Sequence, residues 1–135
     1  VMDDFAHHPT AVHETITGLR HFYPGMRLIA AFEPRTNSSR RSIFQEHYAR
    51  SFDEADLICI KQPPGLESIP ESERLDTRRL VEDICGRDKE ALFFNDTDSL
   101  EEYILGIARP GDLIVCMSNG SFDGLPERLA SGLTN

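Results

Sequence analysis

The sequence predicts an α/β protein with a doubly wound, mostly parallel sheet. Short continuous apolar runs, rich in β-branched or aromatic residues, alternate with segments in which apolar residues recur every three or four positions. Continuous apolar runs are typical of strands buried on both faces of a parallel sheet, and the recurrent spacing is typical of amphipathic helices. Their repeated alternation implies right-handed crossovers, with helices that cover both faces of the sheet.

The predicted strands are short. None of them shows the strict alternation of apolar and polar residues that marks a strand with one solvated face. The first is the end of the segment VMDDF, and the others are RLIAAF at 27–32, DLICI at 56–60, ALFF at 91–94 and DLIVCM at 112–117.

The first two predicted helices follow the first two strands. Pro9 suits a first helical turn and so places His8 near the N-cap, while the PG pair at 24–25 ends this helix. A capping box from Ser42 to Gln45 is expected to open the second helix. The apolar positions are Val12, Ile16, Leu19 and Tyr23 in the first helix, then Phe44, Tyr48 and Phe52 in the second.

Three more helices complete the alternation. Asp76 is predicted to be the N-cap of the third helix and Gly86 its stop, and the PG pair at 110–111 ends the fourth. The proline-rich stretch 61–75 is predicted to be a loop long enough to line a site. The apolar positions are Leu80, Val81, Ile84 and Cys85, then Leu100, Ile104 and Ile107, then Leu125 and Leu129.

Length and charge restrict the function classes. The 135 residues suffice for one domain, and 23 acidic against 14 basic side chains give a formal charge of −9. A domain this acidic is a poor candidate for binding nucleic acid or anionic membranes. No apolar run approaches the roughly 18 residues that would indicate a membrane span. We therefore expect neither nucleic acid nor membrane among the partners.

The three cysteines are predicted to be structural. Their number is odd, and their spacing matches no zinc pattern. Apolar neighbours surround them, and nothing basic stands beside them to lower a thiol pKa. All three, Cys59, Cys85 and Cys116, are expected to be buried, reduced thiols of a cytoplasmic protein.

The fold class predicts where a ligand would bind. In open α/β sheets, ligands lie at the carboxyl ends of the strands. The most polar stretches of this chain follow the predicted strands, so composition and topology indicate the same edge. These stretches are DDFAHHP, EPRTNSSR, KQPPGLES, NDTD and SNGSFDG.

The stretch DDFAHHP at 3–9 allows three interpretations. It can be a polar turn in which Asp and His cap a helix, a metal site, or a turn that contacts a nucleotide through an acid and a helix N-terminus. A metal site needs a third or fourth ligand, and the sequence offers none at a workable distance. Asp3 and Asp4 alternate along a strand, so only one of them can face a small pocket.

Two further stretches could hold anions. Arg35 directly follows a strand end, where its guanidinium could pair a carboxylate or phosphate bidentately. Arg40 and Arg41 are expected on the exposed first turn of the next helix. The glycine-containing turn MSNGSFDG could present backbone N–H groups to an anion. Neither a P-loop nor a G-x-G-x-x-G pattern occurs in the chain, so it has no recognisable device of its own for gripping ATP phosphates.

Together these stretches resemble a known family. DDFAHHPTA is similar to the turn that opens the C-terminal domain of the Mur ligases, the ATP-dependent amide-forming ligases of peptidoglycan synthesis. The core D-F-A-H-x-P carries the resemblance, and the strand–helix order fits it along the whole chain. EPRTNS and MSNGSFDG look closest to the recycling branch, which joins UDP-N-acetylmuramate to a murein tripeptide.

The resemblance implies roles for the matching positions. Asp4 matches the acid that contacts the nucleotide, and His7 matches the histidine beside the phosphate region. The positions that match substrate-facing residues of the family are Arg35, Asn37, Ser118, Asn119 and Gly120.

The resemblance also implies what stands outside residues 1–135. Mur ligases have three domains, so this chain is expected to be an excised C-terminal domain without the UDP-sugar domain and the central ATPase domain. ATP and Mg²⁺ belong to the complete enzyme, which activates the muramate carboxylate as an acyl phosphate before the peptide amine attacks. We expect no metal site, tight cofactor binding or catalytic residue in this domain alone.

Two alternatives stay open at this point. The chain could belong to the branch that adds L-alanine, although the PHRY-type and GAGD-type stretches of that branch are missing. It could instead be a free-standing α/β binding module. The start at VMDDF, with almost no residue ahead of the first strand, favours an excised domain over such a module.

Overall fold

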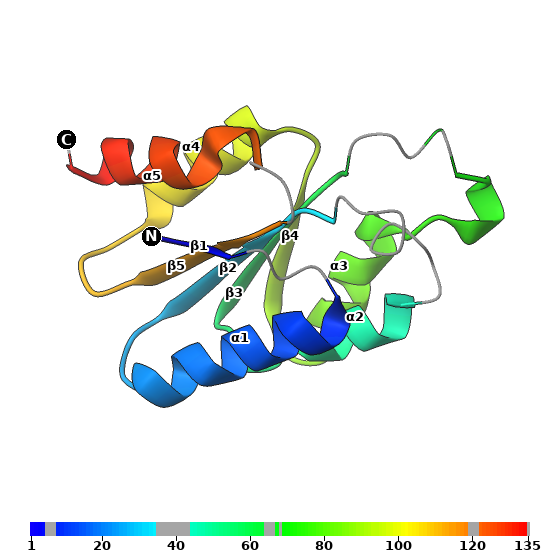
Figure 1. Cartoon of the computed structure of the whole chain (residues 1–135), viewed down its shortest axis with the longest axis horizontal. Coiled ribbons are helices and arrows are strands. Elements are labelled where there is room, and N and C mark those ends of the chain that lie inside the picture. Colours follow the sequence, from blue (N-terminus) through cyan, green and yellow to red (C-terminus); the bar gives the residue numbers. More distant parts are fainter. Residues whose placement is uncertain (5–7, 35–43, 64–66, 68, 119–121, 135) are drawn as a thin grey trace.

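The chain forms one five-stranded parallel sheet covered by helices on both faces, as the computed structural model shows (Figure 1). It describes residues 1–4, 8–34, 44–63, 67, 69–118 and 122–134. The strands are β1 (Met2–Asp4), β2 (Leu28–Phe32), β3 (Leu57–Lys61), β4 (Glu90–Phe94) and β5 (Leu113–Met117). Their spatial order is β1-β5-β2-β3-β4, and all neighbours are parallel. The predicted fold class is therefore confirmed, with strand ends displaced by one residue or so.

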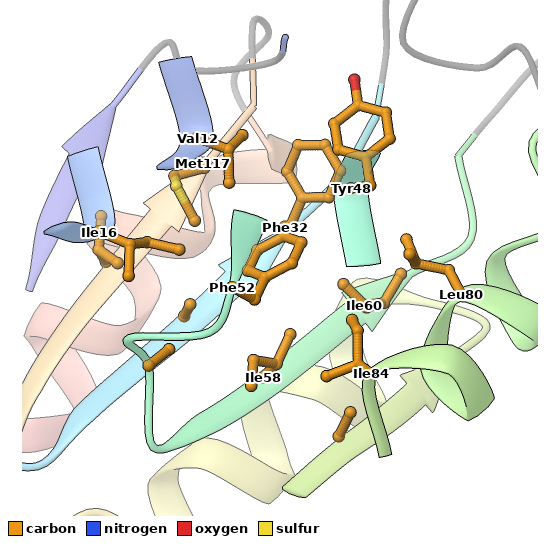
Figure 2. Packing of buried hydrophobic residues seen from close by; sticks show 14 of the residues in the cluster. Val12, Ile16, Phe32, Tyr48, Phe52, Ile58, Ile60, Leu80, Ile84 and Met117 are labelled. Atoms are coloured by element: carbon orange, nitrogen blue, oxygen red, sulfur yellow. The ribbon is translucent and has the colours of Figure 1, made fainter. Parts of the chain in front are cut away.

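Three helices cover one face of the sheet: α1 (Pro9–Phe22), α2 (Gln45–Ser51) and α3 (Thr77–Cys85). Their apolar positions meet every second residue of the strands in one core (Figure 2). Phe32 of β2 lies at the centre, with its ring 5.2 Å from that of Tyr48 and 5.6 Å from that of Phe52 between centroids. Burial raises the pKa of the Tyr48 hydroxyl, so that group stays protonated at neutral pH.

The other face is covered by α4 (Thr97–Ile107) and α5 (Leu125–Thr134). Ile29 and Ala31 of β2 point to this side, whereas Leu28, Ala30 and Phe32 point to the first core. Both faces of the central strand are thus buried, which explains why its sequence is apolar throughout. The second core also contains residues from β3, α4, β5, the 3-10 turn η4 (Phe122–Gly124) and α5: Leu57, Cys59, Leu100, Ile104, Ile114, Cys116, Phe122, Leu125 and Leu129.

The predicted helix ends are largely confirmed. His8 is the N-cap of α1, where its Nδ1 accepts a hydrogen bond from Thr10 N at 3.2 Å, and Pro9 is the first helical residue. Asp76 caps α3 by accepting from Arg79 N at 3.0 Å. Gly86 ends α3 in a right-handed conformation, and the left-handed residue of that turn is Asp88.

Two predictions about individual residues are wrong. The second helix does not open with a capping box: its N-cap is Phe44, which makes no side-chain capping bond, and Ser42 lies outside the described residues. Gln45 instead exchanges two hydrogen bonds with the backbone of Asp76, so it links α2 to the start of α3. Cys85 is exposed at the end of α3, where its Sγ donates to Ala91 O at 3.6 Å.

The remaining cysteines are buried as predicted. Cys59 and Cys116 lie in β3 and β5, and burial raises the pKa of the Cys59 thiol to about 12. No helix in the described part of the chain is long and apolar enough to cross a membrane.

Candidate functional site

The sheet has a topological switch point between β2 and β5. These strands are neighbours, but the helix that follows β2 packs on one face and the helix that follows β5 packs on the other. In open α/β sheets, ligands bind at such a point, outside the carboxyl ends of the strands. Glu33 follows β2 at this point, and Ser118 follows β5.

A buried ion pair lies at this switch point. Lys61 Nζ, at the end of β3, donates to Glu33 Oε2 at 2.6 Å, and Ser118 Oγ donates to Glu33 Oε1 at 3.2 Å. Glu33 is 0% exposed, and Lys61 is 7% exposed. Residues at the ends of three strands therefore form one charged cluster in which Glu33 is fully buried and Lys61 nearly so, which is a costly arrangement unless every charge has a partner.

Asp123 brings a fourth element to the cluster. Its Oδ2 lies 3.7 Å from Lys61 Nζ and accepts a hydrogen bond from Thr97 Oγ1 at 2.6 Å. Phe122 and Asp123 both have φ of 53°, in the left-handed region that non-glycine residues rarely adopt. This backbone holds the Phe122 ring in the core and the Asp123 carboxylate at the rim.

A pocket of about 310 Å³ opens over this cluster on the side of α4 and α5. Asp96, in its wall, caps α4 by accepting from Ser99 N at 2.7 Å, and that bond holds the pKa of the Asp96 carboxyl below its usual value. Arg128 pairs with Asp98 and Glu101 and so fastens α5 to α4 beside the pocket. The lining residues are Lys61, Asn95, Asp96, Thr97, Asp98, Asp123 and Arg128.

A second pocket, of about 390 Å³, opens on the α3 side of the same edge. Gln62, the residue after β3, forms its floor and accepts from Thr77 Oγ1 at 2.5 Å. The Arg78 guanidinium carbon lies 4.2 Å from the centroid of the Phe93 ring. Arg74 donates from Nε to Ile69 O at 2.7 Å, so its side chain is held at the pocket wall.

The arginines of this acidic chain differ in their partners. Arg20, Arg27, Arg87 and Arg128 each form an ion pair at 2.5 Å with an aspartate. Arg74 and Arg78 form no ion pair with any described residue, and both line the second pocket. Arg78 in the first turn of α3 and Arg74 just ahead of that helix could pair with a carboxylate of a ligand, although the carboxylates of Glu71 and Asp76 line the same pocket.

The predicted site residues fall into two groups. The structure places Asp4 in β1 opposite Met117, so its backbone lies at the carboxyl edge beside the end of β5, and it places Ser118 in the buried cluster. It does not describe the side chain of Asp4. The other predicted positions lie outside the described residues: His7, Arg35, Asn37, Asn119 and Gly120.

The turn DDFAHHP is described only in part. For His8 the capping interpretation is confirmed, and its ring also packs edge-on against Phe44 at 4.8 Å between centroids. Among the described residues, no group of three or more His, Cys, Asp or Glu is arranged to hold a metal ion.

The sequence interpretation missed Glu33, Lys61, Asp123 and the pocket arginines. A signal was present for the first two, since each is a charged residue that directly ends or follows an apolar strand. Such a residue leaves the sheet at its carboxyl edge, and two of opposite sign on adjacent strands can pair. Asp123 could not be found this way, because it does not directly follow a strand. Its left-handed backbone conformation, which the sequence pattern does not reveal, places its carboxylate near Lys61.

The strand order and the two pockets at the carboxyl edge define a doubly wound α/β domain with a candidate ligand site at that edge. The chain belongs to the family described as Mur ligase, glutamate ligase domain, which it matches over residues 1–120.

Curated relatives agree with this family. The chain is 36% identical over 98% of its length to the UDP-N-acetylmuramate–L-alanyl-γ-D-glutamyl-meso-2,6-diaminoheptandioate ligase of Escherichia coli K12. It is 33% identical over 95% of its length to the UDP-N-acetylmuramate–L-alanine ligase of Caldanaerobacter subterraneus. The chain spans only 27% of the length of each of these relatives.

Solved structures agree as well. A murein peptide ligase of Psychrobacter arcticus is 32% identical, with a TM-score of 0.81 over 98% of this chain and 27% of that one. A domain from a Haemophilus ducreyi protein, assigned as a ligase of the same tripeptide, is 32% identical, with a TM-score of 0.72 over 97% of this chain and 88% of that one.

Proposed function

We propose that residues 1–135 are the C-terminal domain of a murein peptide ligase. The complete cytoplasmic enzyme would use ATP and Mg²⁺ to join UDP-N-acetylmuramate to L-alanyl-γ-D-glutamyl-meso-diaminopimelate in peptidoglycan recycling. The observation that carries this proposal is the 36% identity to the Escherichia coli ligase over 98% of the chain. A UDP-sugar domain and a central ATPase domain would account for the rest of the relative's length.

The role proposed for this domain is to dock the peptide at the carboxyl edge. The tripeptide carries several carboxylates, and the described edge offers Arg74 and Arg78 beside the fixed amide of Gln62. The Phe93 ring under Arg78 provides an apolar surface for the aliphatic stem of a side chain. Arg35 and Asn37, together with the turn from Ser118 to Gly120, would supply the contacts nearer to the switch point.

We propose that ATP and Mg²⁺ are held mainly by the central domain of the complete enzyme. The sequence has no P-loop, and the described residues include no cluster suited to a metal ion. We therefore assign this chain only an edge of the nucleotide site, formed by Asp4 and His7 next to the central domain. Closure of this edge over the nucleotide would exclude water from the reacting groups.

A substrate assay on the complete protein tests the proposal. The purified protein is given ATP, Mg²⁺ and UDP-N-acetylmuramate with either the tripeptide or L-alanine, and product is followed by mass spectrometry. We expect an amide product with the tripeptide and far less with L-alanine. Preference for L-alanine would assign the protein to the L-alanine-adding branch, which the 33% identity to such a ligase keeps as the second candidate. No product with either amine would favour a binding module.

A further inference from the structure

We propose that Lys61 is a positioning residue that ties both ends of the last rim turn to the sheet. The consequence for substrate binding rests on the proposed function, because Asn119 and Gly120 stand between the two tied residues, Ser118 and Asp123.

The tie consists of four side chains from separate parts of the chain. Ser118 Oγ donates a hydrogen bond to one carboxylate oxygen of Glu33, and Lys61 Nζ donates to the other at 2.6 Å. Lys61 Nζ also lies 3.7 Å from the Asp123 carboxylate. The ammonium group of Lys61 therefore lies between the carboxylate that holds the start of the turn and the carboxylate at its end. Because Lys61 ends a central strand, its base is rigid.

The energetics favour a positioning role over a purely stabilising one. Removing an ammonium and a carboxylate from water costs more than a packed apolar pair of similar volume would, so a buried ion pair is a poor device for stability alone. The left-handed backbone of Phe122 and Asp123 adds local strain at the same point. Strain of this kind persists only where surrounding contacts fix it, and the contacts of the Asp123 carboxylate with Lys61 and with Thr97 are of this kind.

Two variants and one control distinguish loss of this tie from a general loss of stability. Lys61→Met alone would remove the ammonium group that pairs with the buried Glu33 carboxylate. The main variant is therefore the double change Glu33→Gln with Lys61→Met, which removes both charges together. Asp123→Asn is the second variant: an amide oxygen can still accept from Thr97, and asparagine tolerates the left-handed region. The control is Arg27→Met with Asp112→Asn, since this pair has two hydrogen bonds, at 3.0 and 2.5 Å, but precedes β2 and β5 at the opposite edge.

The first experiment is hydrogen exchange followed by mass spectrometry on the complete protein. Backbone amides in peptides that cover 118–124 should exchange about tenfold faster in the Glu33→Gln/Lys61→Met variant and in Asp123→Asn. They should keep the wild-type rate in the Arg27→Met/Asp112→Asn control. Equal exchange in wild type and both tie variants would overturn the proposal, and so would an equal acceleration in the control.

The second experiment is steady-state kinetics on the same proteins. The tie variants should raise KM for the tripeptide about tenfold and leave KM for ATP unchanged, whereas the control should change neither. A uniform fall in kcat with unchanged tripeptide KM would overturn the positioning role. If the wild-type protein forms no tripeptide product, the proposed function fails, and the hydrogen-exchange result still decides whether Lys61 holds the turn.

Discussion

Arg78 lies over the ring of Phe93, with 4.2 Å between its guanidinium carbon and the ring centroid. Phe93 is in β4 and Arg78 in the first turn of α3, so the contact spans the mouth of the pocket between the two elements. A cation–π contact uses none of the guanidinium N–H groups in a hydrogen bond, so these groups stay available to a planar partner. This geometry suits a carboxylate that enters along the ring.

We expect Arg78→Ala to raise the tripeptide KM of the complete enzyme by roughly 10- to 150-fold, the equivalent of one charge-assisted hydrogen bond of about 1.5–3 kcal/mol. Arg79→Ala is the matched control, because Arg79 is the next residue, is exposed, and pairs with Asp83 in its own helix at 4.0 Å. Kinetics with the tripeptide varied at saturating ATP measure the difference. A similar loss in both variants would mean that helix charge, rather than the pocket, controls binding.

Arg35 leads to a second prediction about substrate choice. In the sequence it stands three residues after Phe32, the last residue of β2. Arg35→Ala should reduce kcat/KM for the tripeptide by roughly 10- to 150-fold, and Arg35→Lys should recover only part, because lysine lacks the planar fork. Arg40→Ala should change little. Steady-state kinetics that vary tripeptide and ATP separately test this, and the reverse ranking of the two alanine variants would refute the placement.

Asp4 leads to a prediction about nucleotide use. Neighbouring residues of a strand point to opposite faces, so only one of Asp3 and Asp4 can face the nucleotide. In the complete enzyme, Asp4→Ala should raise KM for ATP far more than Asp3→Ala does. An equal increase in the KM for ATP in both variants would show that Asp4 is not the residue that faces the nucleotide.

The pair of Arg27 and Asp112 should make stability depend on pH. Hydrogen bonds from Arg27 hold the pKa of the Asp112 carboxyl below its ordinary value of 3.8. A lowered native pKa contributes stability that is present above the unfolded value and is lost as pH falls through the native value. Urea unfolding between pH 7 and pH 2 should therefore show a loss that begins near pH 4. Asp112→Asn should be less stable at pH 7 and should lose less on acidification; an unchanged pH profile in this variant would contradict the assignment.

The chain by itself should fold but should bind ATP only weakly. It has two complete cores, whereas the sequence has no P-loop. Calorimetry with ATP and Mg²⁺ should give no binding in the micromolar range, and the chain should show no ligase activity. A micromolar or tighter constant would overturn the interpretation as an excised domain.

Several features were predictable because they depend on neighbours in sequence. Continuous apolar strands, three- to four-residue helical spacing, and caps such as His8 and Asp76 involve residues within one turn or one strand. The failed capping box shows where local reasoning stops. The Gln45 side chain forms hydrogen bonds with the backbone of Asp76, 31 residues away, instead of capping the start of its own helix.

The sequence alone determined the fold class and the resemblance to the Mur ligases, and it predicted the edge at which a ligand would bind, since period and motif spacing are properties of the linear chain. Only the tertiary structure decided that β5 inserts between β1 and β2, and this insertion brings Ser118 to Glu33. It likewise decided that Lys61 pairs with Glu33 and lies near Asp123, 62 residues further along the chain. The physical reason is that a buried charge must find its partner in space, and strand order together with one left-handed turn determines which partner that is.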